Sequence, residues 1–186
     1  MATLTPKRLN LTLSFHLENP VPPSIASSKK LWSQMPREQR ALAARHFFDP
    51  ESKTNAMLRQ MAIAAIAKSR NSRESSIRKG TREQLENWLS NNALISEEVA
   101  DTVIRLYLLH TQLPMIESFL DGLQIPHTHG LIEESFDTSS LPADQLAAAA
   151  TRLTERFGPE NAHLYLAYTA AQTGDWAETI RKIPLA

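Results

Sequence analysis

The sequence predicts an all-α protein, and three observations lead to this prediction. Glycine occurs only five times in 186 residues, whereas sheet proteins need glycine in many of their tight turns. Alanine, leucine, glutamine, glutamate and arginine dominate from residue 36 onward, and these residues favour helices. Apolar residues in this part recur at helical spacing, so each helix can bury one face. We expect either stacked helical hairpins, in a short solenoid-like repeat, or a compact helical bundle.

Composition and charge exclude several classes of function. The formal net charge is zero, so no global field recruits nucleic acid or an anionic membrane. Cysteine is absent, which excludes a disulfide framework, a thiolate nucleophile, a zinc site that uses sulfur and an iron–sulfur cluster. No apolar run approaches the roughly 20 residues that cross a bilayer. We therefore expect a soluble, cytoplasmic protein with no cofactor.

Residues 1–35 differ from the rest of the chain, and we expect an arm and a linker here. Apolar residues alternate with polar ones between positions 9 and 17, which is typical of a half-buried strand. A single strand leaves its backbone groups unpaired, so an irregular arm is the favoured alternative. Prolines and serines between residues 20 and 28 indicate an extended linker. Helical periodicity begins at Lys29, and the helical domain is expected to span 36–186.

The ends of the first two helices of this domain are visible in the sequence. Pro36 suits the first turn of a helix, because that amide has no intrahelical partner. Asp49 precedes Pro50, which pushes it out of helical space and ends the helix. A second helix is expected from Ser52 to about Ser69, followed by a break at 71–76. Its apolar face consists of Leu58, Met61, Ala62, Ala65 and Ile66.

Capping residues mark two helix starts in the middle of the chain. Thr81, with Gln84 three residues later, matches the capping box and predicts a short helix. Ser96 is followed by two acidic residues, which favour the N-terminus of another helix. A further short helix is expected at 115–123.

The last third of the chain begins with its longest irregular stretch, at 124–141. Pro142 then opens a helix to about Phe157, and Gly158 with Pro159 breaks it. Two more helices are expected, at 160–172 and at 175–183.

Three segments of the helical domain resemble one another, at 36–80, 81–125 and 142–186, with 126–141 as an insertion. They open with Pro-Arg-Glu-Gln, Thr-Arg-Glu-Gln and Pro-Ala-Asp-Gln. A period of about 45 residues fits an array of helical hairpins, in which stacked neighbours share a continuous core. The alternative is that alanine-rich helices resemble each other by composition alone, in a bundle without a true repeat.

The last segment resembles a tetratricopeptide hairpin, in which a leucine and a small residue precede a Gly-Asp-aromatic turn. The residues that carry this resemblance are Leu166, Ala167, Gly174, Asp175 and Trp176. Ala170 stands where an aromatic residue is usual, and Thr179 where alanine is usual. The resemblance covers about 25 residues. It implies an interaction scaffold.

His127 and His129 are the sharpest candidates for chemistry. Two imidazoles one residue apart on a loop can face one metal ion, and Glu133 or Glu134 can complete a histidine–carboxylate set. Loop histidines that face solvent are the alternative interpretation.

Three further histidines, His46, His110 and His163, stand at comparable places in the three similar segments. In a solenoid, equivalent positions form a row rather than converge on a point. Partly buried histidines with one hydrogen-bonded nitrogen are therefore favoured over a shared metal site.

A basic segment is the candidate for binding nucleic acid, phosphate or a partner protein. Serines and Asn71 between its cations suit phosphate contacts. No aromatic residue lies within the segment to stack on bases, which argues against single-strand recognition. Acidic residues prevail from 97 to 137, so the two charged faces could complement each other between copies. The candidate cations are Lys68, Arg70, Arg73, Arg78, Lys79 and Arg82.

The sequence contains no glycine-rich phosphate loop, nucleophile elbow or zinc-protease helix. No catalytic residue is therefore expected. The favoured function is a non-catalytic interaction or scaffold module that binds a protein, a peptide or another copy of itself in a homo-oligomer. The alternatives are nucleic-acid or phosphate binding through 68–82, and a metal-dependent enzyme that uses the loop histidines.

Overall fold

The structure is a computed structural model, and it describes residues 27–52, 54–172 and 174–182. The regular secondary structure of this part of the chain is helical apart from one short hairpin, which confirms the all-α prediction. The strand predicted between positions 9 and 17 lies outside the described residues.

Within the described residues the helices follow one another with short connections, apart from the longer connection at 123–142. They are α1 (Ser28–Gln34), α2 (Arg37–Phe48), α3 (Ala56–Ser69), α4 (Glu74–Ile77), α5 (Arg82–Ser90), α6 (Glu97–Thr111), α7 (Leu113–Gly122), α8 (Ala143–Phe157), α9 (Pro159–Gln172) and α10 (Gly174–Lys182). The predicted insertion holds an antiparallel hairpin of β1 (His127–Thr128) and β2 (Leu131–Ile132), and a 3₁₀ turn, η1 (Thr138–Ser140).

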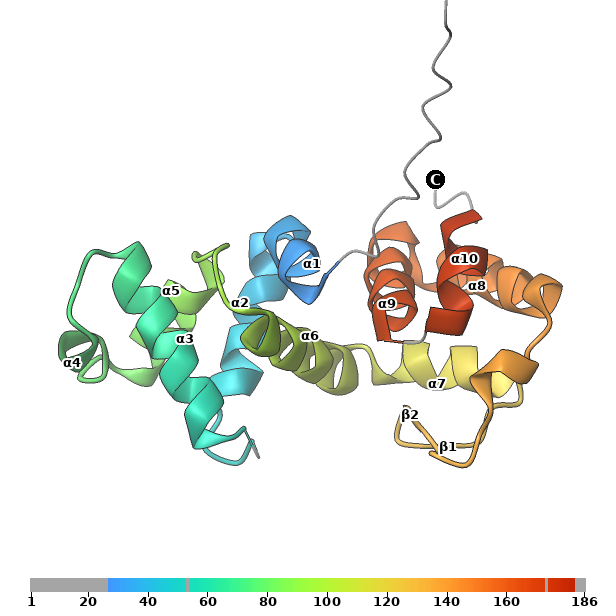
Figure 1. The fold of residues 1–186 in the computed structure, drawn as a ribbon, viewed down its shortest axis with the longest axis horizontal. Coiled ribbons are helices and arrows are strands. Elements are labelled where there is room, and N and C mark those ends of the chain that lie inside the picture. Colours follow the sequence, from blue (N-terminus) through green and yellow to red (C-terminus); the bar gives the residue numbers. More distant parts are fainter. Residues whose placement is uncertain (1–26, 53, 173, 183–186) are drawn as a thin grey trace, which may run out of the picture.

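Helix α6 lies at the centre of an elongated molecule (Figure 1). Helices α2 to α5 form one end, helices α7 to α10 form the other, and α6 lies between them. It packs against α1, α2, α3 and α7. Ser96 caps its N-terminus as predicted, with the side chain accepting a hydrogen bond from the Val99 amide. The side chains that α6 buries are Val99, Ala100, Thr102, Val103, Ile104, Tyr107 and Leu108.

Helix α1 lies before residue 36, where the helical domain was expected to start, and it begins next to Lys29, where helical periodicity was expected to begin. Among the described residues, helical structure begins at Ser28, within the segment 1–35 that was predicted to be arm and linker. Trp32 is fully buried, and its Nε1 donates a hydrogen bond to the backbone carbonyl of Asn92, 2.8 Å away. The Glu97 carboxylate accepts hydrogen bonds from the amides of Ser28 and Lys29, so α6 caps the start of α1. Long-range contacts thus stabilise a helix that is too short to be stable alone.

Helices α2 and α5 pair at one end of the molecule, and the C-terminus of α2 and the N-terminus of α5 follow the sequence signals. Asp49 ends α2 as predicted, and Thr81 and Gln84 form the capping box of α5. Helix α3 begins four residues later than predicted. Asn55 caps it, and an Arg59 guanidinium that donates to the Asp49 carbonyl at 2.7 Å holds the preceding turn.

Helices α8, α9 and α10 pack on one another at the other end, and α7 packs on α8. Phe119 of α7 meets the rings of Tyr165 and Trp176 edge to face. The two ends of the molecule are joined by α9, which contacts α1. Tyr168 and Gln172 of α9 both donate hydrogen bonds to the Asp101 carboxylate of α6, at 2.9 and 2.7 Å.

The contacts between helices can be compared with the boundaries of the three similar sequence segments. In the third segment α8, α9 and α10 pack together, whereas α2 of the first segment packs against α5 and α6 of the second. The sequence repeat and the tetratricopeptide resemblance both stay predictions.

Replacing Trp32 by Phe is expected to lower the free energy of unfolding by about 1–3 kcal/mol, because the buried Asn92 carbonyl loses a donor. Urea unfolding followed by circular dichroism measures this change. Trp88→Phe is the control, because Trp88 is only half-buried and its Nε1 makes no hydrogen bond within the described residues. Equal losses in the two variants would contradict the role assigned to the Trp32–Asn92 bond.

Candidate functional site

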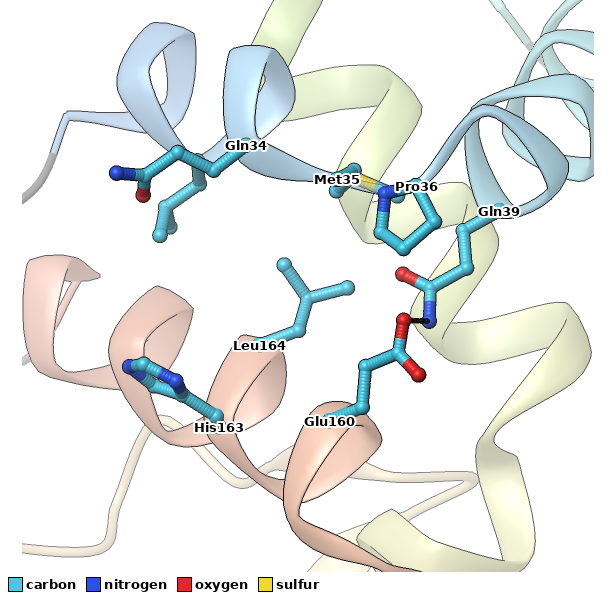
Figure 2. A pocket seen from close by; sticks show the side chains of 8 residues that line it. Gln34, Met35, Pro36, Gln39, Glu160, His163 and Leu164 are labelled. Atoms are coloured by element: carbon cyan, nitrogen blue, oxygen red, sulfur yellow. Dashed lines mark hydrogen bonds between the residues drawn. The ribbon is translucent and has the colours of Figure 1, made fainter. Parts of the chain in front are cut away.

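A cleft of about 390 Å³ lies between the α1–α2 junction and α9 (Figure 2). Gln34 and Pro36 lie on one wall, and Glu160 and His163 lie on the other. The apolar part of the cleft comes from Leu31, Met35 and Leu164, which are between 5% and 8% exposed. Its size and its apolar lining fall within the range of ligand-binding pockets.

Two helix boundaries create the cleft. Met35 is extended, at φ −60° and ψ 138°, because a residue that precedes proline disfavours helical conformations. Helix α1 therefore ends there, and α2 leaves in a new direction after Pro36. Glu160 stands in the first turn of α9, where the helix dipole favours a carboxylate.

Polar side chains form the rim of the cleft. The Gln39 amide Nε2 lies 3.5 Å from Glu160 Oε1 and 3.3 Å from Asn161 Oδ1, and both are hydrogen-bonding distances. Gln34 and His163 are exposed and make no hydrogen bond within the described residues. The rim therefore offers an amide, an imidazole and part of a carboxylate to a ligand.

The ionisable groups that line the cleft are a carboxylate, Glu160, and an imidazole, His163. No hydroxyl, thiol or amine belongs to the eight residues that line it, so it contains no side-chain nucleophile of these types. Glu160 and His163 lie three residues apart on one face of α9, where both can contact the same ligand.

The structure does not gather the predicted metal ligands. His127 lies in β1, and its Nε2 is 3.1 Å from Asp121 Oδ1 of α7. His129 lies in the tight turn of the hairpin at φ 49°, where Gly130 follows at φ 76°. Glu133 is exposed. Among the residues that the structure describes, no group of three histidine, aspartate or glutamate side chains could hold a metal ion.

Two of the three helix histidines do meet, and the third lies in the cleft. The rings of His46 and His110 stack with their centroids 4.8 Å apart and their planes at 16°. Nε2 of His46 is 3.3 Å from the Thr111 hydroxyl. Burial lowers the pKa of His46, and the positive charges of His110 and Arg45 lower it further, while Asp49 opposes them.

The lowered pKa links His46 to stability. The unfolded chain binds this proton more tightly than the folded chain does, so neutral His46 favours the fold. That contribution is complete above the unfolded value of 6.5 and decreases as the pH falls below it.

Half of the basic segment is already engaged within the protein. Arg70 lies over the Trp88 ring, 4.8 Å from its centroid, and this aromatic partner comes from outside the segment. Arg78 pairs with Glu74, and Arg82 pairs with Glu86 and Asp49. The remaining cations are exposed and form no ion pair or hydrogen bond within the described residues; they are Lys68, Arg73 and Lys79.

The chain was compared with protein-family models, with curated proteins and with solved structures, and none of the three comparisons found a match. Among the helices that the structure describes, none is long and apolar enough to span a membrane.

Replacing His110 by Gln is expected to raise the pKa of His46 toward 6.5, because a neighbouring positive charge is removed. The pKa is expected to stay below that value, since burial is its larger cause. Proton NMR of the imidazole ring between pH 4 and 8 measures the change. His129→Gln, in the exposed turn, serves as the control and should leave His46 unchanged. An unchanged His46 pKa in His110→Gln would show that the charge of the stacked His110 ring does not influence His46.

Proposed function

We propose that this chain is a non-catalytic binding module whose cleft holds a short segment of a partner protein. The observation that carries the proposal is the pairing of a buried apolar lining with a polar rim on two facing walls. Such sites fix a ligand by burying its apolar groups and orient it with a few hydrogen bonds.

The rim suits the backbone of an extended peptide. The side-chain amide of Gln34 has both a donor and acceptors, which are the groups that a peptide unit needs. Glu160 adds a negative charge, which favours a lysine or arginine on the partner. The lining of Leu31, Met35 and Leu164 matches an aliphatic side chain of the same segment.

A library of displayed random peptides, selected on the purified protein, tests this proposal. We expect the selected peptides to share an aliphatic residue beside a basic one. Glu160→Lys should weaken their binding about tenfold or more, because it reverses the charge at the rim. Fluorescence polarisation with a labelled selected peptide measures the affinity.

Glu134→Lys is the matched control, because Glu134 is exposed and lies outside the cleft. The same charge reversal there should leave the affinity unchanged. If the selected peptides bind both variants with the affinity of the unaltered protein, their binding site lies elsewhere, and the result counts against the cleft.

Phosphate or nucleic-acid binding is the second candidate function, and the three free cations of the basic segment favour it. Lys68, Arg73 and Lys79 are exposed and unpaired within the described part of the chain. Acidic side chains neutralise their neighbours Arg78 and Arg82, which limits the positive surface. The supporting observation is therefore narrower than the one for the cleft.

Filter binding of duplex DNA at low and high salt tests this second candidate. A protein that contacts phosphates through these cations should lose affinity steeply as salt rises, because bound counterions are released. Arg73→Glu with Lys79→Glu should abolish the binding, whereas Arg45→Glu, on α2, should weaken it much less. DNA binding that does not depend on salt, or an equal loss of DNA binding in both variants, would exclude the basic segment as the nucleic-acid site.

A further inference from the structure

A second cavity, of about 210 Å³, lies between α7 and α8. Its apolar lining includes Phe119 and Leu153, which are 2% and 3% exposed, and half-buried Phe157. Gly122 and Ala149 also line it, and their small side chains leave it room. The lining suits a small aromatic or aliphatic group.

Two arginines stand at this cavity on successive turns of α8. Arg152 and Arg156 both line it and both are exposed. Nη1 of Arg156 donates a hydrogen bond to the Ser118 hydroxyl at 2.9 Å, and its guanidinium lies 5.1 Å from the centroid of the Phe157 ring. These two contacts hold the guanidinium in place before any ligand arrives.

Within the described residues, no carboxylate forms an ion pair with either of these two arginines. The acidic residues nearest to them in the sequence are Glu155 and Glu160, and neither forms an ion pair with either arginine in the part of the chain that the structure describes. Like charges four residues apart destabilise a helix. The pair is therefore an unfavourable arrangement for α8 alone, and it becomes favourable when an anion lies between the two side chains.

We propose that this cavity binds the carboxylate of a small apolar acid. The planar guanidinium forks suit the two oxygens of a carboxylate, and the aromatic lining takes the apolar body. The carboxylate can belong to a free organic acid or to the C-terminus of a peptide, and the chemistry of recognition is the same. The site is separate from the cleft, because the two cavities share no residue.

NMR titration of the ¹⁵N-labelled protein tests this site with benzoate as the probe and benzamide as its neutral counterpart. Benzoate at millimolar concentration should shift the amides of Gly122 and Arg152 in a saturable way. Benzamide, which keeps the ring and loses the charge, should bind at least about tenfold more weakly. Equal binding of the two compounds, or benzoate shifts elsewhere only, would overturn the proposal.

Two variants and one control separate the charges from the cavity. Arg152→Gln with Arg156→Gln should weaken benzoate about tenfold or more, since the charged donors are lost. Gly122→Leu should also abolish binding by filling the cavity, and it should fold, because a Cβ at Gly122 meets no atom within 4 Å. Arg73→Gln is the control, because Arg73 precedes α4, is exposed and forms no ion pair within the described residues; this variant should bind as the unaltered protein does. If Arg73→Gln weakened benzoate binding equally, the loss would come from the overall charge of the protein, and the proposed site would be overturned.

The source of the carboxylate is decided by a second pair of probes. N-acetylphenylalanine carries a carboxylate like that of a peptide C-terminus. N-acetylphenylalanine amide, in which a carboxamide replaces this carboxylate, is its neutral counterpart. Tighter binding of N-acetylphenylalanine than of benzoate supports a peptide C-terminus as the natural ligand. Tighter binding of benzoate supports a free organic acid. Failure of both acids to bind would overturn the proposed carboxylate site. It would leave the peptide-binding proposal for the cleft unaffected, because that proposal concerns a separate cavity.

Discussion

The fold depends on covering helix α6. Its buried side chains extend from Val99 to Leu108, so the helix needs partners around much of its circumference. Helices α1, α2 and α3 supply them toward one end of the molecule, and α7 continues the chain toward the other. Asp101 on α6 also holds α9, through Tyr168 and Gln172. Burial raises the pKa of Tyr168, and Asp101 raises it further, so this phenol stays a hydrogen-bond donor. Helices α1 and α9 thereby come to face each other, and the cleft is the space between them.

Local signals in the sequence predicted most of the helices, because caps and breakers act within a few residues. Thr81, Ser96 and Asp49 mark helix ends that the structure confirms. The helical pattern was expected from Lys29, but α1 was placed outside the helical domain, since nothing local stabilises this short helix beyond the Ser27 cap. Its stability comes from Asn92 and Glu97, more than sixty residues away.

The candidate sites were harder to predict, because each one joins distant segments. Gln39 and Glu160 meet across the cleft from positions 121 residues apart, and no motif in the sequence indicates such a meeting. The basic segment was visible as composition, but its neutralisation by Asp49 and Glu86 was not. His46 and His110 had been noted at comparable positions, and the structure adds that their rings stack. The contact of His127 with Asp121, which lies on the preceding helix, was not predicted from the sequence.

The position of the cleft has a consequence for the mechanics of the chain. Its walls belong to helices near the two ends of the described sequence. A ligand that contacts both walls acts as a non-covalent cross-link, and it closes a loop that spans most of the protein. Binding there stabilises the native state by mass action and does so for both ends at once. A bound ligand would couple the local openings of α1 and α9, so that amides of both helices exchange together, as one cooperative unit.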